Sequence, residues 1–258
     1  MLGHYILAQH QLIRPMHYQK VFIVMKRKSI NLALIISSVL LPLLPNISHA
    51  TGMVPETTVL LIDEAEGGGS MNVKNTDDKA ALLYTTIQEI DGSSNKGAML
   101  VATQPIVRLE AGQTQRVRFV LNTTEPLQVE QYKRVIFEGI PQAKAVGKKQ
   151  IITTIRQNLP VIIHPKGLPE FTTPWEKLEW KAQGNVLTVT NPSPYVVRMS
   201  PQVVTKPSKI SGSFDKTFIL PGETLTVHLK SSTTDKQVEM FPASRFGFEV
   251  GSYAASMK

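Results

Sequence analysis

Short segments in which apolar and polar residues alternate recur along most of this chain. One of them spans residues 115–121, where Val117 and Phe119 alternate with Arg116 and Arg118. Alternation with a period of two is typical of a strand that buries one face. Comparable segments lie at residues 81–90, 135–140, 151–155, 186–190, 225–229 and 246–250. Since no stretch of ten or more residues carries a helical stripe, the sequence predicts an all-β chain built as antiparallel sandwiches or barrels.

The N-terminal segment, residues 1–50, differs in composition from the rest of the chain. It contains no Asp or Glu, and from Met25 onward a basic stretch leads into an apolar run at residues 30–44. This is the pattern of a secretory signal peptide that is cleaved after Ala50. A membrane span needs about 20 apolar residues, and prolines end this run early, so no membrane insertion of the mature chain is expected. Because residues 1–24 fit no signal design, Met25 is interpreted as the true start.

The same leader accounts for much of the basic charge. The chain carries +8 at pH 7, but five of its 28 Lys and Arg lie in the leader, which leaves 23 against 20 acidic residues and a net charge of about +3. A nucleic-acid-binding face needs a concentrated basic stripe, so no nucleic-acid partner is expected. The chain has no cysteine, and an exported protein without disulfides depends on a full-sized core.

A search for catalytic and metal-binding patterns gives little. Beyond the leader the only histidines are His164 and His228, which lie far apart in apolar or linker contexts. No set of ligands has the spacing of a metal site, and no nucleophile has a base and an orienting residue beside it. The sequence therefore predicts no catalytic residue, no metal and no cofactor. Trp175 and Trp180 are interpreted as core or linker packing in preference to a ligand platform.

The mature chain divides near its middle. Residues 164–174, "HPKGLPEFTTP", contain three prolines and are interpreted as a linker. This predicts a leader at residues 1–50, one domain at residues 51–165 and a second at residues 166–258. Each domain has about 100 residues, the size of one immunoglobulin-like sandwich.

Several phrases of the mature chain follow one another in an order typical of one protein family. They are "PIVRLEAGQTQRVR" at residues 105–118, "GIP" at 139–141, "LPVIIHP" at 159–165 and "NPSPY" at 191–195. The ordered set resembles the periplasmic pilus-assembly chaperones over nearly the whole mature chain. The resemblance implies two immunoglobulin-like β-sandwich domains at an angle, with a cleft between them. It also implies a periplasmic location, with pilin subunits and an outer-membrane usher as partners.

In this family the chaperone lends its seventh strand to a pilin that lacks its last strand. Backbone hydrogen bonds then supply affinity, and alternate side chains fill the open groove of the pilin. The resemblance places the lending strand at residues 150–158, and registering Pro165 on the proline of the family turns Ile151, Thr153 and Ile155 toward the pilin. The other interpretation is that this set belongs to the core of the domain, as one of the two sets on the strand must.

The best-known branch of the family holds the terminal carboxylate of the pilin with basic residues on the first and seventh strands. Those positions fall here near Thr58 or Val59 and near Pro160, and none of these residues is basic. A desolvated carboxylate still needs a cationic partner that donates hydrogen bonds.

The phrase "QYKRVIFEGIP" supplies a replacement by resemblance, because it is similar to the Tyr-x-Arg pattern of the alternate, or archaic, branch. The resemblance implies a carboxylate anchor at Arg134, with Lys79 as its partner and Arg156 as a reserve. The alternative is that Arg134 is a solvated strand residue and Lys79 a turn charge. At the level of function, a secreted immunoglobulin-like binding module or adhesin would share the fold and the leader.

Overall fold

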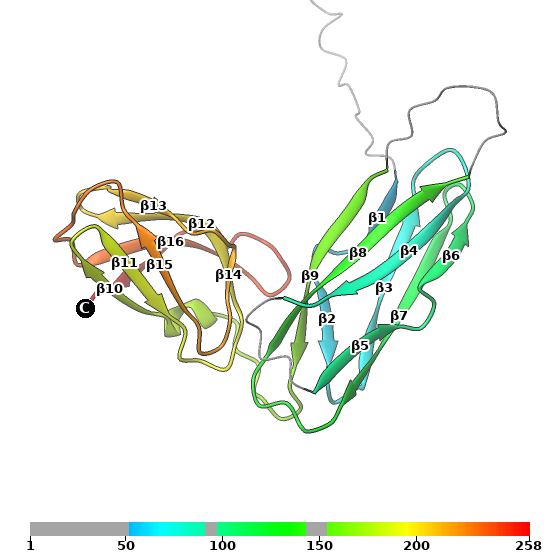
Figure 1. The fold of residues 1–258 in the computed structure, drawn as a ribbon, viewed down its shortest axis with the longest axis horizontal. Helices are drawn as coiled ribbons and strands as arrows, with labels where there is room; N and C mark the ends of the chain where they lie inside the picture. The colour runs from blue at the N-terminus through cyan, green and yellow to red at the C-terminus, as the bar shows by residue number, and fades with distance from the viewer. Residues whose placement is uncertain (1–51, 91–96, 143–153) are drawn as a thin grey trace, which may run out of the picture. The chain divides into compact units, whose positions relative to one another are not determined.

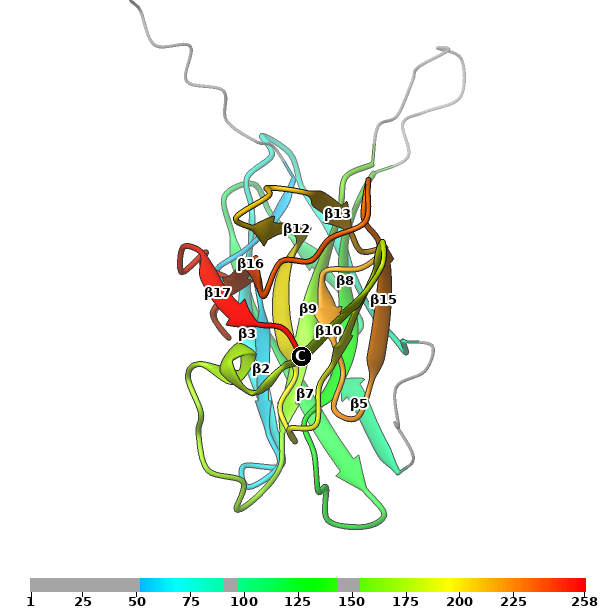
Figure 2. The same cartoon turned by 90° about the vertical axis from the view of Figure 1, so that its left-hand side faces the viewer.

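The computed structural model describes residues 52–90, 97–142 and 154–258. Figures 1 and 2 show a chain made almost wholly of strands, and the one helical element in the described residues is the short 3-10 helix η2 (Pro174–Lys177). The all-β prediction is confirmed. None of the helical segments in the described ranges has the length and apolar character that a membrane crossing requires.

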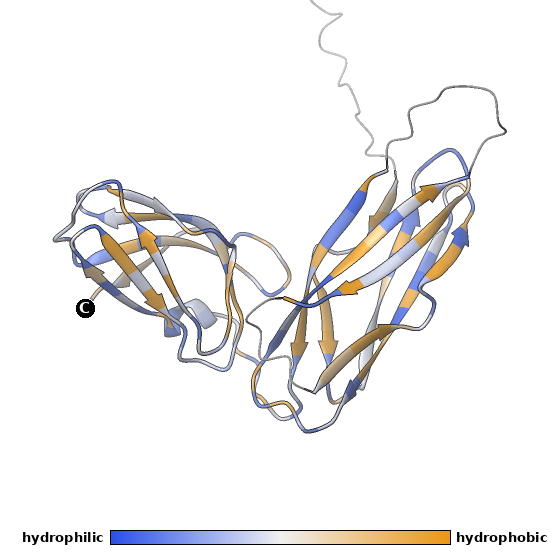
Figure 3. Cartoon of the chain, in the orientation of Figure 1, coloured by the Kyte–Doolittle hydropathy of each residue, from blue (hydrophilic) through white to orange (hydrophobic). Residues whose placement is uncertain are grey.

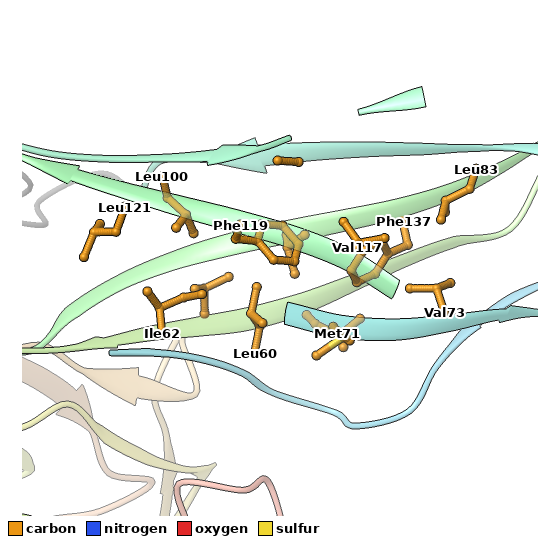
Figure 4. Packing of buried hydrophobic residues seen from close by; sticks show 14 of the residues in the cluster. Leu60, Ile62, Met71, Val73, Leu83, Leu100, Val117, Phe119, Leu121 and Phe137 are labelled. Carbon is orange, nitrogen blue, oxygen red and sulfur yellow. The ribbon is translucent and has the colours of Figure 1, made fainter. Parts of the chain in front are cut away.

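The first nine strands form one hydrogen-bonded sheet in the order β5-β7-β3-β2-β9-β8-β4-β6, with β1 paired to β3. They are β1 (Met53–Pro55), β2 (Leu60–Asp63), β3 (Gly68–Asn75), β4 (Ala81–Gln88), β5 (Ala98–Ala102), β6 (Ile106–Leu109), β7 (Thr114–Thr123), β8 (Gln131–Pro141) and β9 (Arg156–His164). The β2–β9 pair is parallel and the other pairs are antiparallel. The sheet folds over into two layers that enclose a common core (Figure 4).

Alternation along each strand builds this core, as the sequence predicts. On β7 the side chains of Val117, Phe119 and Leu121 are buried, while the alternate residues Arg116, Arg118 and Val120 are exposed. Phe119 meets Phe137 of β8 edge to face, with the ring centroids 6.5 Å apart, an arrangement that aromatic pairs prefer. Figure 4 shows these side chains pointing toward one another from both layers, and Figure 3 shows polar and apolar residues alternating along the strands.

The phrase "EAGQ" at residues 110–113 forms the turn between β6 and β7 and closes one end of this sandwich. Gly112 has φ +72°, a left-handed conformation that favours glycine, and its amide donates to the Asn75 carbonyl at 2.9 Å. The buried Asn75 side chain donates to the carbonyls of Lys79, Leu109 and Glu110 at 2.9, 3.2 and 3.2 Å. These hydrogen bonds give the turn a structural role.

The remaining strands form two further sheets around a second core. They are β10 (Glu179–Gln183), β11 (Val186–Thr190), β12 (Val197–Lys206), β13 (Ser211–Ser213), β14 (Phe218–Ile219), β15 (Thr224–His228), β16 (Gln237–Ala243) and β17 (Tyr253–Ser256). One sheet has the order β10-β11-β15, and the other the order β13-β12-β16-β17 with β14 paired to β12. Trp175 and Trp180 belong to this second core, which confirms their interpretation as packing residues.

Acid should destabilise the second sandwich in part through Asp235. The Thr205 hydroxyl, then the hydroxyl and amide of Ser208, lower the pKa of this buried carboxyl, and burial opposes them. A folded pKa below the unfolded one adds stability above about pH 4, and that stability is lost as pH falls through the folded pKa. We expect the stability of Asp235→Asn to fall less steeply below pH 4 than that of the wild type. Denaturant unfolding at pH 3 to 7 measures this, and parallel curves would contradict it.

Candidate functional site

The strand β9 is paired along only part of one of its edges. Toward β8 it pairs from Arg156 to Ile163, whereas β2 pairs only with its end, from Val161 to His164. For residues 156–160 no strand in the described part of the chain covers the edge that faces away from β8. Unpaired backbone N–H and C=O groups in a row are a template for a strand from another chain.

From Leu159 onward, alternate side chains of β9 point into the core. Leu159, Val161 and Ile163 are buried in the core of the first sandwich, with 7%, 0% and 0% of their surface exposed. With a period of two, Gln157 and Ile155, the residue before β9, fall in the same row; Gln157 is half-buried and Ile155 is 43% exposed. The core row thus runs past the part of the strand that its own domain covers. The other residues of the predicted row, Ile151 and Thr153, lie outside the described residues.

Arg134 lies where the sequence places the anchor. On β8 it pairs in register with Pro160 of β9, so it is directly across from the position at which the best-known branch carries its lysine. Its Nε and Nη2 donate to the side-chain oxygen and the carbonyl of Asn158 at 2.7 and 2.6 Å. Its Nη1 donates to the Tyr132 hydroxyl at 3.4 Å. These hydrogen bonds hold the guanidinium in one orientation.

The structure does not bring Lys79 together with Arg134. On β4 the residue that pairs with Arg134 is Gln88, whereas Ala81, beside Lys79, pairs with Pro141. Seven strand residues separate those two pairs, a distance of about 23 Å at the usual rise of a strand. Lys79 therefore belongs to the opposite end of this sheet.

Arg156 has a counter-ion of its own. Its Nε lies 2.8 Å from Oε2 of Glu138, and 66% of the Arg156 side chain is exposed. Glu138 is four residues along β8 from Arg134, about 13 Å away at the usual rise. Arg156 is thus close to the strand edge but is compensated there and separate from Arg134.

Sequence reasoning missed a second arginine beside Tyr132. Arg198 lies on β12 and pairs in register with Phe218 of β14, and the Phe218 ring stacks on Tyr132 with the centroids 4.3 Å apart. Burial lowers the pKa of the Arg198 guanidinium, the Tyr132 hydroxyl opposes this effect, and the charge of Arg134 lowers the pKa further. Arg198 follows an apolar pair in a strand, which gives it no signal beyond that of any partly exposed strand residue.

The buried carboxylate of Glu130 contacts residues from two segments that are far apart in the sequence. Oε1 of Glu130 lies 2.9 Å from Nδ1 of His164, and Oε2 accepts from the Val196 amide at 2.9 Å. Nε2 of His164 lies 2.8 Å from the Leu168 carbonyl, which can only accept, so Nε2 is the donor in that hydrogen bond. His164 therefore has a structural role, and no cluster of metal-ligating residues is found in the described ranges.

These elements define a two-domain β-sandwich protein with an open strand edge next to two arginines. Comparison with known proteins adds the family. The profile "Pili and flagellar-assembly chaperone, PapD N-terminal domain" matches residues 52–169, and "Pili assembly chaperone PapD, C-terminal domain" matches residues 173–251. The chain therefore belongs to the pilus-assembly chaperones of the chaperone–usher pathway.

Individual relatives agree with this assignment. The uncharacterised fimbrial chaperone YhcA of Escherichia coli strain K12 is 50% identical over 209 residues, which cover 81% of this chain and 92% of YhcA. Among solved structures, the YadV chaperone is similar with a TM-score of 0.65 at 18% identity, covering 80% of this chain and all of YadV. The Salmonella enterica SafB chaperone, solved with the SafA pilin, gives 0.64 at 20% identity, covering 81% of this chain and 98% of its match. The two structural likenesses show the fold.

Proposed function

We propose that this chain is a periplasmic chaperone that binds newly exported pilin subunits by lending them the strand at residues 150–158, which leads into β9, and delivers them to an outer-membrane usher. The observation that carries the proposal is the free edge of β9 at residues 156–160, in line with the exposed Ile155. Membership of the chaperone family supports it. In this proposal the protein binds its clients and does not catalyse a reaction on them.

The physical mechanism is strand addition. A pilin strand that pairs with the free edge gains backbone hydrogen bonds along its length. The row formed by Ile151, Thr153 and Ile155 fills the groove that the missing pilin strand leaves open, which removes apolar surface from water. Arg134, already oriented by Asn158, binds the terminal carboxylate of the pilin and so fixes the register of the added strand.

Export and domain division belong to the same proposal. Residues 1–50 act as a leader that is cleaved after Ala50, with Met25 as the true start. The mature protein then consists of a strand-lending domain at residues 51–165 and a second domain at residues 166–258. The ranges matched by the two family profiles support this division.

The test is to tag the C-terminus, purify the protein from the periplasm of its own host and measure native masses of what co-elutes. A 1:1 complex with a small exported pilin that survives until denaturation is the expected result. Free or self-associated protein, recovered while pilin genes are expressed, would instead favour the binding module or adhesin.

A substitution at Ile155 tests the strand-lending step separately. Ile155→Asp should lower the amount of co-purified pilin at least about tenfold, because a carboxylate cannot enter an apolar groove without a large desolvation cost. Ile106→Asp is the matched control, since Ile106 is 58% exposed and lies on the edge strand β6, well away from β9. The same pilin-to-chaperone ratio in both variants would contradict the role of Ile155.

A further inference from the structure

Two arginines lie beside the Tyr132 hydroxyl without a carboxylate partner. Within the described ranges no ion pair includes Arg134 or Arg198. The third cation of this neighbourhood, Lys216, lies 5.0 Å from the centroid of the Phe218 ring and is paired with Glu223. Arg134 and Arg198 are thus the uncompensated cations of the cluster.

Arg198 is the more constrained of the two. Its Nη1 is buried and finds no hydrogen-bond partner among the residues that the structure describes. A buried donor without a partner costs free energy, and arginine cannot escape the cost by losing its proton. The charge of Arg134 adds to that cost. An anion between the two guanidiniums would relieve both penalties at once.

The orientation of Arg134 also leaves room for a second donor. Asn158 occupies one edge of its guanidinium through Nε and Nη2, and Nη1 is directed at Tyr132. The donors that remain for an anion are therefore on the side of Tyr132, where Arg198 interacts with the same hydroxyl. Neither Lys79 nor Arg156 can supply the second donor. Lys79 lies at the other end of the sheet, and Arg156 is paired with Glu138.

We propose that Arg198 is the second cation of the carboxylate anchor, so that Arg134 and Arg198 bind the terminal carboxylate of the client together, on either side of the Tyr132 hydroxyl. This inference rests on the proposed function. It gives the anchor one residue from β8 of the first sandwich and one from β12 of the second, and the bound client then holds strands of both sandwiches.

The experiment uses the pilin that co-purifies with the wild type, prepared with its natural carboxylate and with a C-terminal amide. Arg198→Met removes the charge but keeps an apolar stem, Arg198→Lys keeps the charge, and Lys79→Met is the matched control. Arg198→Met should retain the carboxylate form at least about tenfold less well than the wild type, with a much smaller change for the amide form. Arg198→Lys and Lys79→Met should retain most of the binding.

The outcomes separate this inference from the proposed function. If Arg198→Met binds the carboxylate pilin as well as the wild type does, or loses both forms equally, Arg198 is not an anchor although the chaperone function stands. If Arg198→Met fails to fold, an Arg198→Lys variant that folds and shows no preference for carboxylate over amide overturns the inference. If the wild type itself holds no pilin, the proposed function fails and the inference fails with it.

Discussion

Replacing Arg134 by alanine is expected to lower pilin recovery at least about 30-fold, the effect of losing 2 kcal/mol or more from a buried charge pair. The client carboxylate, once covered, would lose a guanidinium that Asn158 holds in place. The fold should survive, because Asn158 is exposed and water can replace the lost hydrogen bonds. The pilin-to-chaperone ratio in native mass spectra and the unfolding temperature of the variant measure the two effects.

Arg156→Ala is the control for charge on the same pair of strands. Arg156 is exposed and paired with Glu138, and an exposed ion pair contributes only about 0–1 kcal/mol. We expect Arg156→Ala to recover pilin as the wild type does. If Arg134→Ala shows unchanged recovery, or if the two variants lose pilin equally, the assignment of the anchor to Arg134 is refuted.

The sequence predicts the core residues of this protein well because apolar and polar residues alternate along each strand, and the apolar ones face the core. Val117 and Phe119 are buried, and Arg116 and Arg118, which alternate with them, are exposed, as the period of two requires. The parallel pairing of β2 with β9 is different, because it joins residues about 100 positions apart in the chain. Alternation assigns a face to each residue but does not say which strand lies beside it, so alternation alone does not predict the free edge of β9, and only the family resemblance points to this segment.

Strand register also sets Arg134 apart from the other residues predicted for the anchor. The two residues that precede Arg134 in "QYKRVIF" are buried, since Tyr132 is 1% exposed and Lys133 is 0% exposed. Lys133 turns inward, and its Nζ reaches the carboxylate oxygens of Glu89 at 2.6 and 2.5 Å. That contact exists because Glu89 follows Gln88, whose partner across the sheet is Arg134.

Strand register also explains why the sequence alone does not show that Lys79 lies far from Arg134 and that Arg198 lies near it. Lys79 is close in sequence to the predicted strand at residues 81–90, but the antiparallel register of that strand with β8 places it away from Arg134. Arg198 is 64 residues from Arg134 in the sequence and meets the cluster through the stack of Phe218 on Tyr132. A pair of cations contributed by two sandwiches depends on long-range packing. A motif within one strand therefore cannot predict which residues form the pair.

The largest effect on stability is expected at Asn191, the first residue of the "NPSPY" phrase. Its side chain is 0% exposed and donates to the carbonyls of Tyr195 and Ile219 at 2.7 and 3.3 Å. Its Oδ1 accepts from the amide and the hydroxyl of Ser193 at 3.1 and 2.6 Å. The "NPSPY" phrase is thus a turn whose conformation is stabilised by the side-chain amide of Asn191. This turn directly precedes the segment that leads to Arg198.

Asn191→Ala should therefore destabilise the second sandwich by at least about 3 kcal/mol, because several buried polar groups would lose their partner at 1–3 kcal/mol each. The unfolding temperature should fall by roughly 10 °C. Asn185→Ala is the matched control, since Asn185 is an exposed turn residue whose substitution should cost less than about 0.5 kcal/mol. Thermal and denaturant unfolding of both variants measure the difference. If the unfolding curves of the two variants coincide, the stability of the turn does not depend on the Asn191 amide. The "NPSPY" phrase would then need an explanation other than stability.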